Sequence, residues 1–383
     1  MSILKRLYWI NFLEGCYFHA PIVSLFLTSN AIGVGALFFS QVFYAVGTLL
    51  FEVPFGVFAD KYGHEKSIRL GYLIDAICLM LLVVYPNEYS LYILYFFRGA
   101  GGAFISGSLE TVLYNVDQKN YTKNLAIATQ LMTLGDVFAV IVATVLFGLF
   151  GDFSFEILIL LTVSAQLMNF VFTFGLPNLR RVKIIESGVH EVQILKSSFD
   201  LLRSNMSVRK LLIWSIFIIS GTQMLELSAP LIMRDVGVSD FLIPAVFVIG
   251  SLLSVLFLKL FVYFESKSFS GLNIVRSTCF AVFGIIFVSV DSPIVAYLSF
   301  LLMYSLRDVL MPLYYKRISD LASDHNRATV LSVFSMYKYV ALLILRAVAG
   351  VLDSATNTIL MLCIFSICGI FIFTNSYILQ KSK

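Results

Sequence analysis

Ionisable side chains that interrupt long apolar segments are the residues of this sequence best suited to chemistry. Glu14, Asp136 and Glu226 each lie in such a segment. On insertion scales a charged side chain at the centre of a membrane-spanning helix costs roughly 2.5 to 3.5 kcal/mol, so it needs a partner, a water-filled cavity or a function. Because a low dielectric favours the neutral form of a carboxyl group, we expect these acids to exchange protons or to bind a cationic group. The alternative is a static ion pair with a basic residue of another segment.

Five further charges interrupt similar segments and complete the predicted set: Arg98, Arg307, Asp308, Lys338 and Arg346. Arg98, Lys338 and Arg346 are the partners that a static pair with the three acids would use. The four basic residues would instead supply the counter-charge if a substrate were anionic. Arg307 and Asp308 are neighbours that point about 100° apart on a helix, so at least one of them needs another partner.

A group of polar residues in the apolar segments is predicted to offer hydrogen bonds to a substrate: Asn11, His19, Gln41, Gln130, Gln223 and Tyr304. The alternative role of such residues is to hydrogen-bond one helix to another. The sequence also holds 36 Phe and 19 Tyr. An aromatic-lined cavity would suit amphipathic or cationic ligands, whereas lipid-facing surface and interfacial belts are the alternative use of these rings.

Motifs of hydrolases, phosphate-binding loops and metal sites are absent from the sequence. It contains no Gly-rich loop that ends in Lys-Ser or Lys-Thr, and its four His lack the spacing of a metal site. The five Cys suggest neither a metal site nor a disulfide framework. We therefore expect no enzymatic activity, no cofactor and no metal.

The elements that position these residues follow from composition. Of the 383 residues 59% are hydrophobic and 13% are charged, whereas a soluble domain carries about 25% charged residues. Continuous apolar blocks of about 20 residues match the length of a helix that crosses a bilayer, and helices satisfy their own backbone groups in lipid. We predict an all-α membrane protein with twelve transmembrane helices at residues 7–27, 37–58, 68–85, 90–114, 124–150, 154–176, 208–232, 238–263, 270–290, 293–315, 327–351 and 356–379.

The distribution of basic residues predicts the orientation. Most of the 27 Lys and Arg fall in alternate loops and at the two ends, and basic residues stay on the cytoplasmic side. Both termini are therefore predicted to be cytoplasmic, in a multi-pass protein of the cytoplasmic membrane. This bias accounts for the net charge of +4, so no nucleic acid is expected as a partner. With short outer loops, the predicted form is a monomer surrounded by lipid.

The longest polar stretch divides the chain into a first bundle at residues 1–176, a cytoplasmic linker at 177–207 and a second bundle at 208–383. Within the linker, Val192, Leu195, Phe199 and Leu202 recur at helical spacing, which predicts an amphipathic surface helix. The two halves also echo each other, as internal repeats of transporters do. Setting Asn124 on Asn326 aligns Asp136 with Lys338.

The loop after the second predicted span carries the most specific motif. Residues 56–66 read GVFADKYGHEK, in which Gly56, Asp60, Lys61, Gly63 and Lys66 stand at characteristic positions. This segment resembles the signature loop of the major facilitator superfamily (MFS), although the family usually has basic residues at 64 and 65. Gly56 would allow close helix approach, Gly63 a turn with positive φ, and Asp60 a cap on the positive end of a nearby helix.

Further residues are interpreted alongside this motif. Glu52, Gly56 and Asp60 recur every four residues and so share one helix face. The resemblance implies that this face is directed toward the other bundle. Glu110 is expected to join Asp60 and Lys61 in a cytoplasmic gate. Arg98 followed four residues later by Gly102 matches a second family element, whereas the Gly-Pro signature of antiporters is missing from residues 135–139.

The resemblance implies two pseudo-symmetric six-helix bundles that rock about a cavity lined by spans one, four, seven and ten. It implies a secondary transporter similar to bacterial drug and small-molecule exporters. We expect protons as the coupling ion and a small amphipathic molecule as the substrate, exported by alternating access. The alternatives are proton-coupled uptake of an anionic or polar nutrient, and a membrane sensor or immunity protein that transports nothing.

Overall fold

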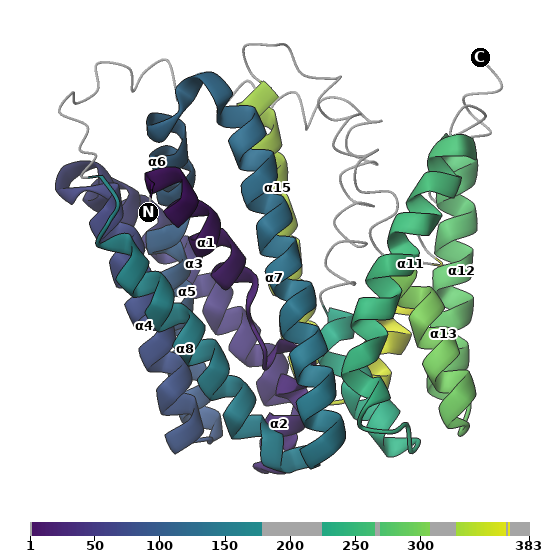
Figure 1. Cartoon of the computed structure of the whole chain (residues 1–383). Coiled ribbons are helices and arrows are strands. Elements are labelled where there is room, and N and C mark those ends of the chain that lie inside the picture. Colours follow the sequence, from purple (N-terminus) through teal and green to yellow (C-terminus); the bar gives the residue numbers. More distant parts are fainter. Residues whose placement is uncertain (1, 178–223, 265–268, 307–326, 365–366, 368–383) are drawn as a thin grey trace. The chain divides into compact units, whose positions relative to one another are not determined.

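The computed structural model describes residues 2–177, 224–264, 269–306, 327–364 and 367. Every regular element in these ranges is a helix (Figure 1). The first part of the chain forms α1 Ile3–Gly15, α2 Val23–Ser29, α3 Val34–Tyr62, α4 His64–Val84, α5 Glu88–Ile105, α6 Ser108–Val116, α7 Tyr121–Phe150 and α8 Phe155–Thr173, with short 3-10 helices at Ala20–Ile22, Gln118–Asn120 and Gly151–Ser154. The second part forms a helix at 224–235, α11 Leu242–Phe264, α12 Phe269–Ser289, α13 Pro293–Ser305, α15 Arg327–Leu352 and a helix at Ala355–Ile364.

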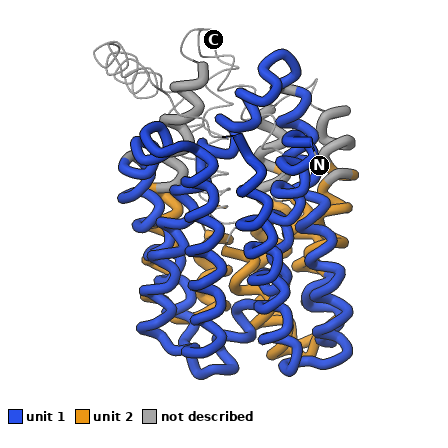
Figure 2. The backbone as a smooth tube through the Cα atoms, turned by 60° about the vertical axis from the view of Figure 1, so that its left-hand side comes forward, with its two compact units in different colours: residues 1–184, 239–245 blue, residues 185–238, 246–383 orange. Residues whose placement is uncertain are grey.

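The chain divides into two compact units, which are coloured separately in Figure 2. Unit 1 consists of residues 1–184 and 239–245, and unit 2 consists of residues 185–238 and 246–383. The amphipathic helix predicted for the linker lies outside the described residues. The boundaries predicted at 176 and 208 therefore stay predictions.

Helices long and apolar enough to cross a membrane are a direct consequence of the hydropathy pattern. In the described part of the chain, Ile3–Ser29, Val34–Glu52, His64–Val84 and the segment Lys123–Thr173 meet that requirement. The last segment includes both α7 and α8, which are joined by the short Gly151–Ser154 turn.

Two predicted spans are interrupted, which the hydropathy pattern did not reveal. In the first span, α1 ends at Gly15 and the helix resumes only at Ala20. Pro21 lies in the first turn after the break, where its fixed φ and missing N–H suit a helix start. In the fourth span, α5 ends at Ile105 and α6 begins at Ser108, because Gly107 adopts a left-handed conformation with φ 68°.

Close approach of α3 and α5 depends on two glycines. A Cβ atom on Gly99 would lie 2.0 Å from the carbonyl oxygen of Tyr44, and one on Gly47 would lie 2.1 Å from that of Phe96. Thr48 Oγ1 also donates to the Gly99 carbonyl at 3.2 Å. Packing through small residues and hydroxyl bonds is the usual means by which helices associate in lipid.

A hydrophobic cluster closes unit 1 at the end where the chain begins. It joins side chains of α1, α4, α6 and α7, namely Leu7, Ile10, Ile68, Tyr72, Leu109, Val112, Leu113 and Ala128, together with Leu176. In unit 2, aromatic rings of α11 and α13 pack edge to face, with 5.3 Å between the ring centroids of Phe247 and Tyr304. Both regions are built by apolar side chains at helical spacing.

Candidate functional site

A buried ion pair joins α4 to α5 inside unit 1. Arg98 Nε lies 2.7 Å from Asp75 Oδ1, and both side chains are buried. Tyr17, in the break of the first span, donates its hydroxyl to Asp75 Oδ2 at 3.1 Å. The Arg98 guanidinium also lies 5.1 Å from the centroid of the Tyr95 ring. The charge of Arg98 is thus neutralised within its own bundle.

The partner of Arg98 differs from those predicted. The alternative to a functional role was a static pair with Glu14, Asp136 or Glu226, whereas the structure places Asp75 beside Arg98. Asp75 interrupts an apolar span and so carried the same signal as the predicted acids. Its pairing depends on how α4 packs against α5, which the sequence pattern does not specify.

Glu14 is held in a different way. It lies half-buried in the last turn of α1, and Tyr72 of α4 donates its hydroxyl to Glu14 Oε2 at 3.1 Å. Among the described residues, no basic side chain forms an ion pair with Glu14. A carboxyl group in this setting can take up a proton or a cationic group without first breaking an ion pair.

The residues of unit 1 that were predicted to hydrogen-bond a substrate lie on different helices and differ in exposure. His19 is buried beside the helix break, and its Nδ1 lies 3.1 Å from Thr162 Oγ1 of α8. Asn11 uses its amide within α1, where Nδ2 donates to the Leu7 carbonyl at 2.8 Å. Gln41 is half-buried on α3, and Gln130 is exposed on α7. Asp136 is likewise exposed on α7, where its backbone nitrogen lies against Gly15, the residue that follows Glu14.

The signature loop shows which predicted roles its residues play. Gly63 has φ 111°, which confirms the predicted positive-φ turn between α3 and α4. Asp60 Oδ1 lies 3.4 Å from Nε2 of His64, the first residue of α4, and this contact is an ion pair when His64 is protonated. The other ring nitrogen, His64 Nδ1, lies 3.3 Å from Ser108 Oγ at the start of α6. His64 therefore connects the loop to the second half of the broken fourth span.

The other predicted roles of this loop stay predictions, and the described residues show the following contacts. Gly56 was predicted to allow close helix approach, yet no heavy atom of the described residues lies within 4 Å of its Cβ position. Glu52, Lys66 and Glu110 are exposed. Lys61 lies 5.1 Å from the ring centroid of Tyr62. In the described part of the chain no ion pair joins Glu110 to Lys61. The predicted gate network stays a prediction.

Unit 2 holds an acid in a similar setting. Glu226 is half-buried in the helix at 224–235, and Tyr304 of α13 donates its hydroxyl to Glu226 Oε1 at 3.2 Å. Tyr304 was predicted as a substrate contact, and in the structure its hydroxyl binds this carboxyl group. Arg346 is half-buried on α15, and Lys338 belongs to the same helix, with a side chain outside the described set. Gln223, Arg307 and Asp308 lie outside the described residues.

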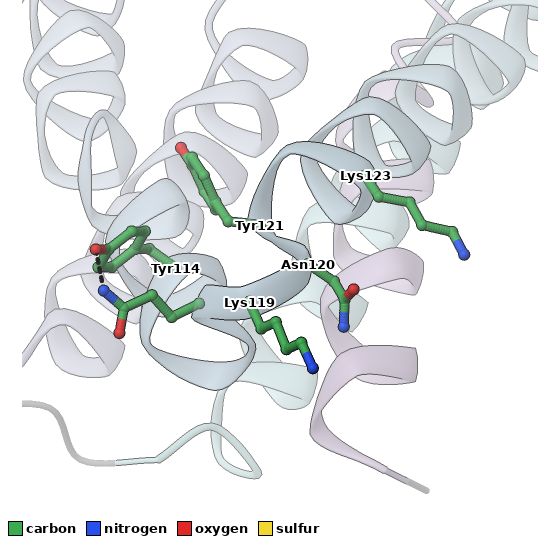
Figure 3. A pocket seen from close by; sticks show the side chains of 6 residues that line it. Tyr114, Lys119, Asn120, Tyr121 and Lys123 are labelled. Atoms are coloured by element: carbon green, nitrogen blue, oxygen red, sulfur yellow. Dashed lines mark hydrogen bonds between the residues drawn. The ribbon is translucent and has the colours of Figure 1, made fainter.

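A shallow pocket of about 560 Å³ lies between α6 and α7, and none of the predicted site residues lines it (Figure 3). Its wall comprises Tyr114, Gln118, Lys119, Asn120, Tyr121 and Lys123. Asp117 lies next to this segment and accepts bonds from Asn120 and from Asn124 Nδ2. Because the Asn120 and Asn124 side chains stabilise its carboxylate, the pKa of Asp117 is lowered from its usual value.

Comparison with known proteins agrees with this architecture. The model of the Major Facilitator Superfamily matches residues 12–345. An uncharacterised MFS-type transporter of Bacillus subtilis, YxaM, is 23% identical over 264 residues, and the aligned segment spans 65% of this chain and 62% of that relative. The nucleoside transporter NupG has a solved structure with a TM-score of 0.80 at 14% identity, covering 98% of this chain and 99% of NupG. A D-xylose–proton symporter gives a TM-score of 0.70 at 15% identity, with 97% of each chain covered. The chain therefore belongs to the Major Facilitator Superfamily and is a multi-pass membrane protein with the helical fold of that family.

Proposed function

We propose that this transporter couples the entry of protons to the export of a small amphipathic molecule that carries a positive charge. The proposal includes alternating access between bundles at 1–176 and 208–383. It also includes a monomer in the cytoplasmic membrane with both termini in the cytoplasm. The observation that carries it is the contrast within unit 1 between Glu14, which is held by a neutral hydroxyl, and Arg98, which is already paired with Asp75.

This contrast favours a cation over an anion as the ligand. An anionic substrate would have to displace Asp75 from Arg98, and removing one partner of a buried pair costs about 3 to 5 kcal/mol. A proton or a cationic group can bind Glu14 while the Tyr72 hydroxyl turns to accept or donate. Competition between the two ligands for one carboxyl group would give exchange, because each can bind only after the other has left.

Exchange of protons for a cationic substrate can be tested with purified protein in liposomes that contain a pH-sensitive dye. A panel of lipophilic cations should dissipate an imposed proton gradient, and Glu14→Gln should abolish that effect. Glu88→Gln is a matched control, because Glu88 is exposed at the start of α5 and contacts Tyr92 on its own helix. Proton movement that responds to organic anions, or that survives Glu14→Gln, would reject this proposal.

Uptake of an anionic or polar nutrient is the second candidate function. The observation in its favour is Arg346, a basic side chain half-buried on α15 in unit 2. Direction separates the two functions in whole cells that are given a labelled substrate. Accumulation that rises when the proton gradient is collapsed indicates export, and accumulation that falls indicates uptake. A sensor or immunity role would be favoured if the protein in liposomes moves nothing and a specific protein partner is captured.

A further inference from the structure

One face of α8 carries four fully buried polar residues. Thr162, Gln166, Asn169 and Thr173 each have 0% exposure. Their spacing of four, three and four residues places them on one side of the helix. We call these residues the α8 polar stripe. At 1.5 Å per residue the stripe is about 16 Å long, which is roughly half the thickness of the hydrocarbon core.

Both ends of the stripe are hydrogen-bonded within unit 1. Thr162 Oγ1 lies 3.1 Å from Nδ1 of His19, at the break of the first span. At the other end, Arg69 of α4 donates its Nε to Thr173 Oγ1 at 3.2 Å. The guanidinium of Arg69 is also 3.8 Å from the centroid of the Phe174 ring.

The middle of the stripe is different. Gln166 Nε2 and Oε1 and Asn169 Nδ2 and Oδ1 are buried without a hydrogen-bond partner among the described residues. Leaving a buried donor or acceptor unsatisfied costs about 1 to 3 kcal/mol, and roughly 90% or more of such groups in folded proteins are paired. Four neighbouring orphan atoms therefore point to a polar ligand between these two side chains.

Helix geometry places the two amides at the same depth in unit 1 as the charged network. Helices α4 and α8 lie side by side, and they run in opposite directions as the third and sixth spans (Figure 1). Measured from the contact between Arg69 and Thr173, Tyr72 lies about 4.5 Å along α4 and Asn169 about 6 Å along α8. On the same scale Asp75 and Gln166 lie about 9 and 10.5 Å from that contact. Asn169 is thus level with the Tyr72–Glu14 bond, and Gln166 with the Asp75–Arg98 pair.

We propose that Gln166 and Asn169 hold a chain of ordered water molecules inside unit 1, between α1, α4 and α8. Water suits the site because a buried water needs two to four polar partners, and an amide side chain offers both donors and acceptors. This hydrated seam is separate from the cavity that the family resemblance places between the two bundles. The water itself does not depend on the transport cycle. Its consequence rests on the proposed function: protons would reach Glu14 through the bundle, from the level of His19.

Radiolytic labelling of the full-length protein in nanodiscs can detect such water, because X-rays convert it into hydroxyl radicals that oxidise adjacent side chains. Tyr72 has 1% exposure and Phe147 of α7 has 0%, so bulk solvent reaches neither ring. We expect Tyr72 to be oxidised many-fold faster than Phe147 in the wild-type protein. Equal slow oxidation of the two rings would overturn the proposal. That result is expected if the two amides pair with each other and hold no water.

Variants test whether the amides hold the water. Replacing both residues (Gln166→Leu with Asn169→Leu) should reduce Tyr72 oxidation to the rate of Phe147. Ser164→Leu is the matched control, because Ser164 lies on the exposed face of α8 and donates its hydroxyl to the Leu160 carbonyl of its own helix. Unchanged Tyr72 oxidation in the double variant would also overturn the proposal. If that variant does not fold, the ratio of Tyr72 to Phe147 oxidation in the wild-type protein still tests whether water is present. Labelling needs no transport, so a hydrated seam together with proton coupling that survives Glu14→Gln would reject only the proposed function.

Discussion

Asp75 and Arg98 are both buried, so each residue depends on the other to offset the loss of hydration. Tyr17 adds a hydroxyl bond to the carboxylate, and this bond connects the pair to the break in the first span. Glu14, only one residue before that break, has a hydroxyl as its partner. The two acids therefore differ in their partners, and we propose that Asp75 stabilises the bundle whereas Glu14 exchanges ligands.

Removing the charge of Asp75 should destabilise the protein severely. Asp75→Asn leaves the Arg98 guanidinium buried without its counter-charge, which costs about 3 to 5 kcal/mol. The apparent Tm of the purified protein in detergent should fall well below that of Glu88→Gln, which alters an exposed acid. A Tm for Asp75→Asn equal to that of the control would show that the pair is not a structural element.

Acidic pH should loosen the segment around Asp117, the loop acid whose pKa is lowered by its bonds to Asn120 and Asn124. A depressed folded-state pKa means that these bonds contribute fully above the unfolded value of 3.8 and are lost as pH falls through the lower folded value. Amide exchange at residues 118–124, corrected for intrinsic rates, should therefore rise at strongly acidic pH. In Asp117→Asn this extra acid sensitivity should be missing, and an identical response in both proteins would contradict the assignment.

At the scale of helices, the hydropathy pattern predicted where spans lie but not where they break. The apolar blocks that contain α3, α4, α7 and α8 were recognised because helix length and lipid thickness constrain them directly. The interruptions near Tyr17 and Gly107 were missed, since Pro21 and Gly107 occur in segments whose mean hydropathy is unchanged by a break. Pro21, six residues after Gly15, was the signal that could have indicated the first interruption.

Side-chain contacts between helices could not be predicted from the sequence for a related reason. Asp75, Tyr72 and Tyr17 belong to the site because of how α4 packs against α1 and α5, and no local pattern fixes that contact. The sequence also does not show which glycines lie where two helices pack closely. Gly56 stood in a recognised motif and faces open space among the described residues, whereas Gly99 controls the approach of α3 to α5.

Substituting these two glycines with Ala should give opposite results. Gly99→Ala places a Cβ atom 2.0 Å from the Tyr44 carbonyl oxygen, so α5 must shift and stability should fall by about 1 to 3 kcal/mol. Gly56→Ala meets no atom of the described residues, and Ala favours a helix over Gly by up to about 1 kcal/mol. Thermal unfolding should show a lower Tm for Gly99→Ala and an unchanged or higher Tm for Gly56→Ala. The reverse order would contradict the packing of α3 on α5.

For the whole molecule, the distribution of Lys and Arg predicts which side faces the cytoplasm. Lys119 lines the exposed pocket between α6 and α7 (Figure 3). Asp152 lies at the other end of α7, in the turn between α7 and α8. In intact cells a membrane-impermeant maleimide should label Asp152→Cys and leave Lys119→Cys unlabelled until the membrane is opened. The native Cys16, Cys78 and Cys363 are buried and Cys279 is half-buried, so labelling is measured relative to the protein without the introduced Cys. Labelling of Lys119→Cys in intact cells would contradict the predicted orientation and place Lys119 on the outer side of the membrane.

Exchange of a proton for a cationic substrate at Glu14 is the central claim, and proton release on binding tests it most directly. Tetraphenylphosphonium, a lipophilic cation, is added to purified protein in weakly buffered detergent solution with a pH indicator. The wild type and Glu88→Gln should release protons as the cation binds, and Glu14→Gln should release none. Binding without proton release in the wild type, or equal release from Glu14→Gln, would contradict the claim.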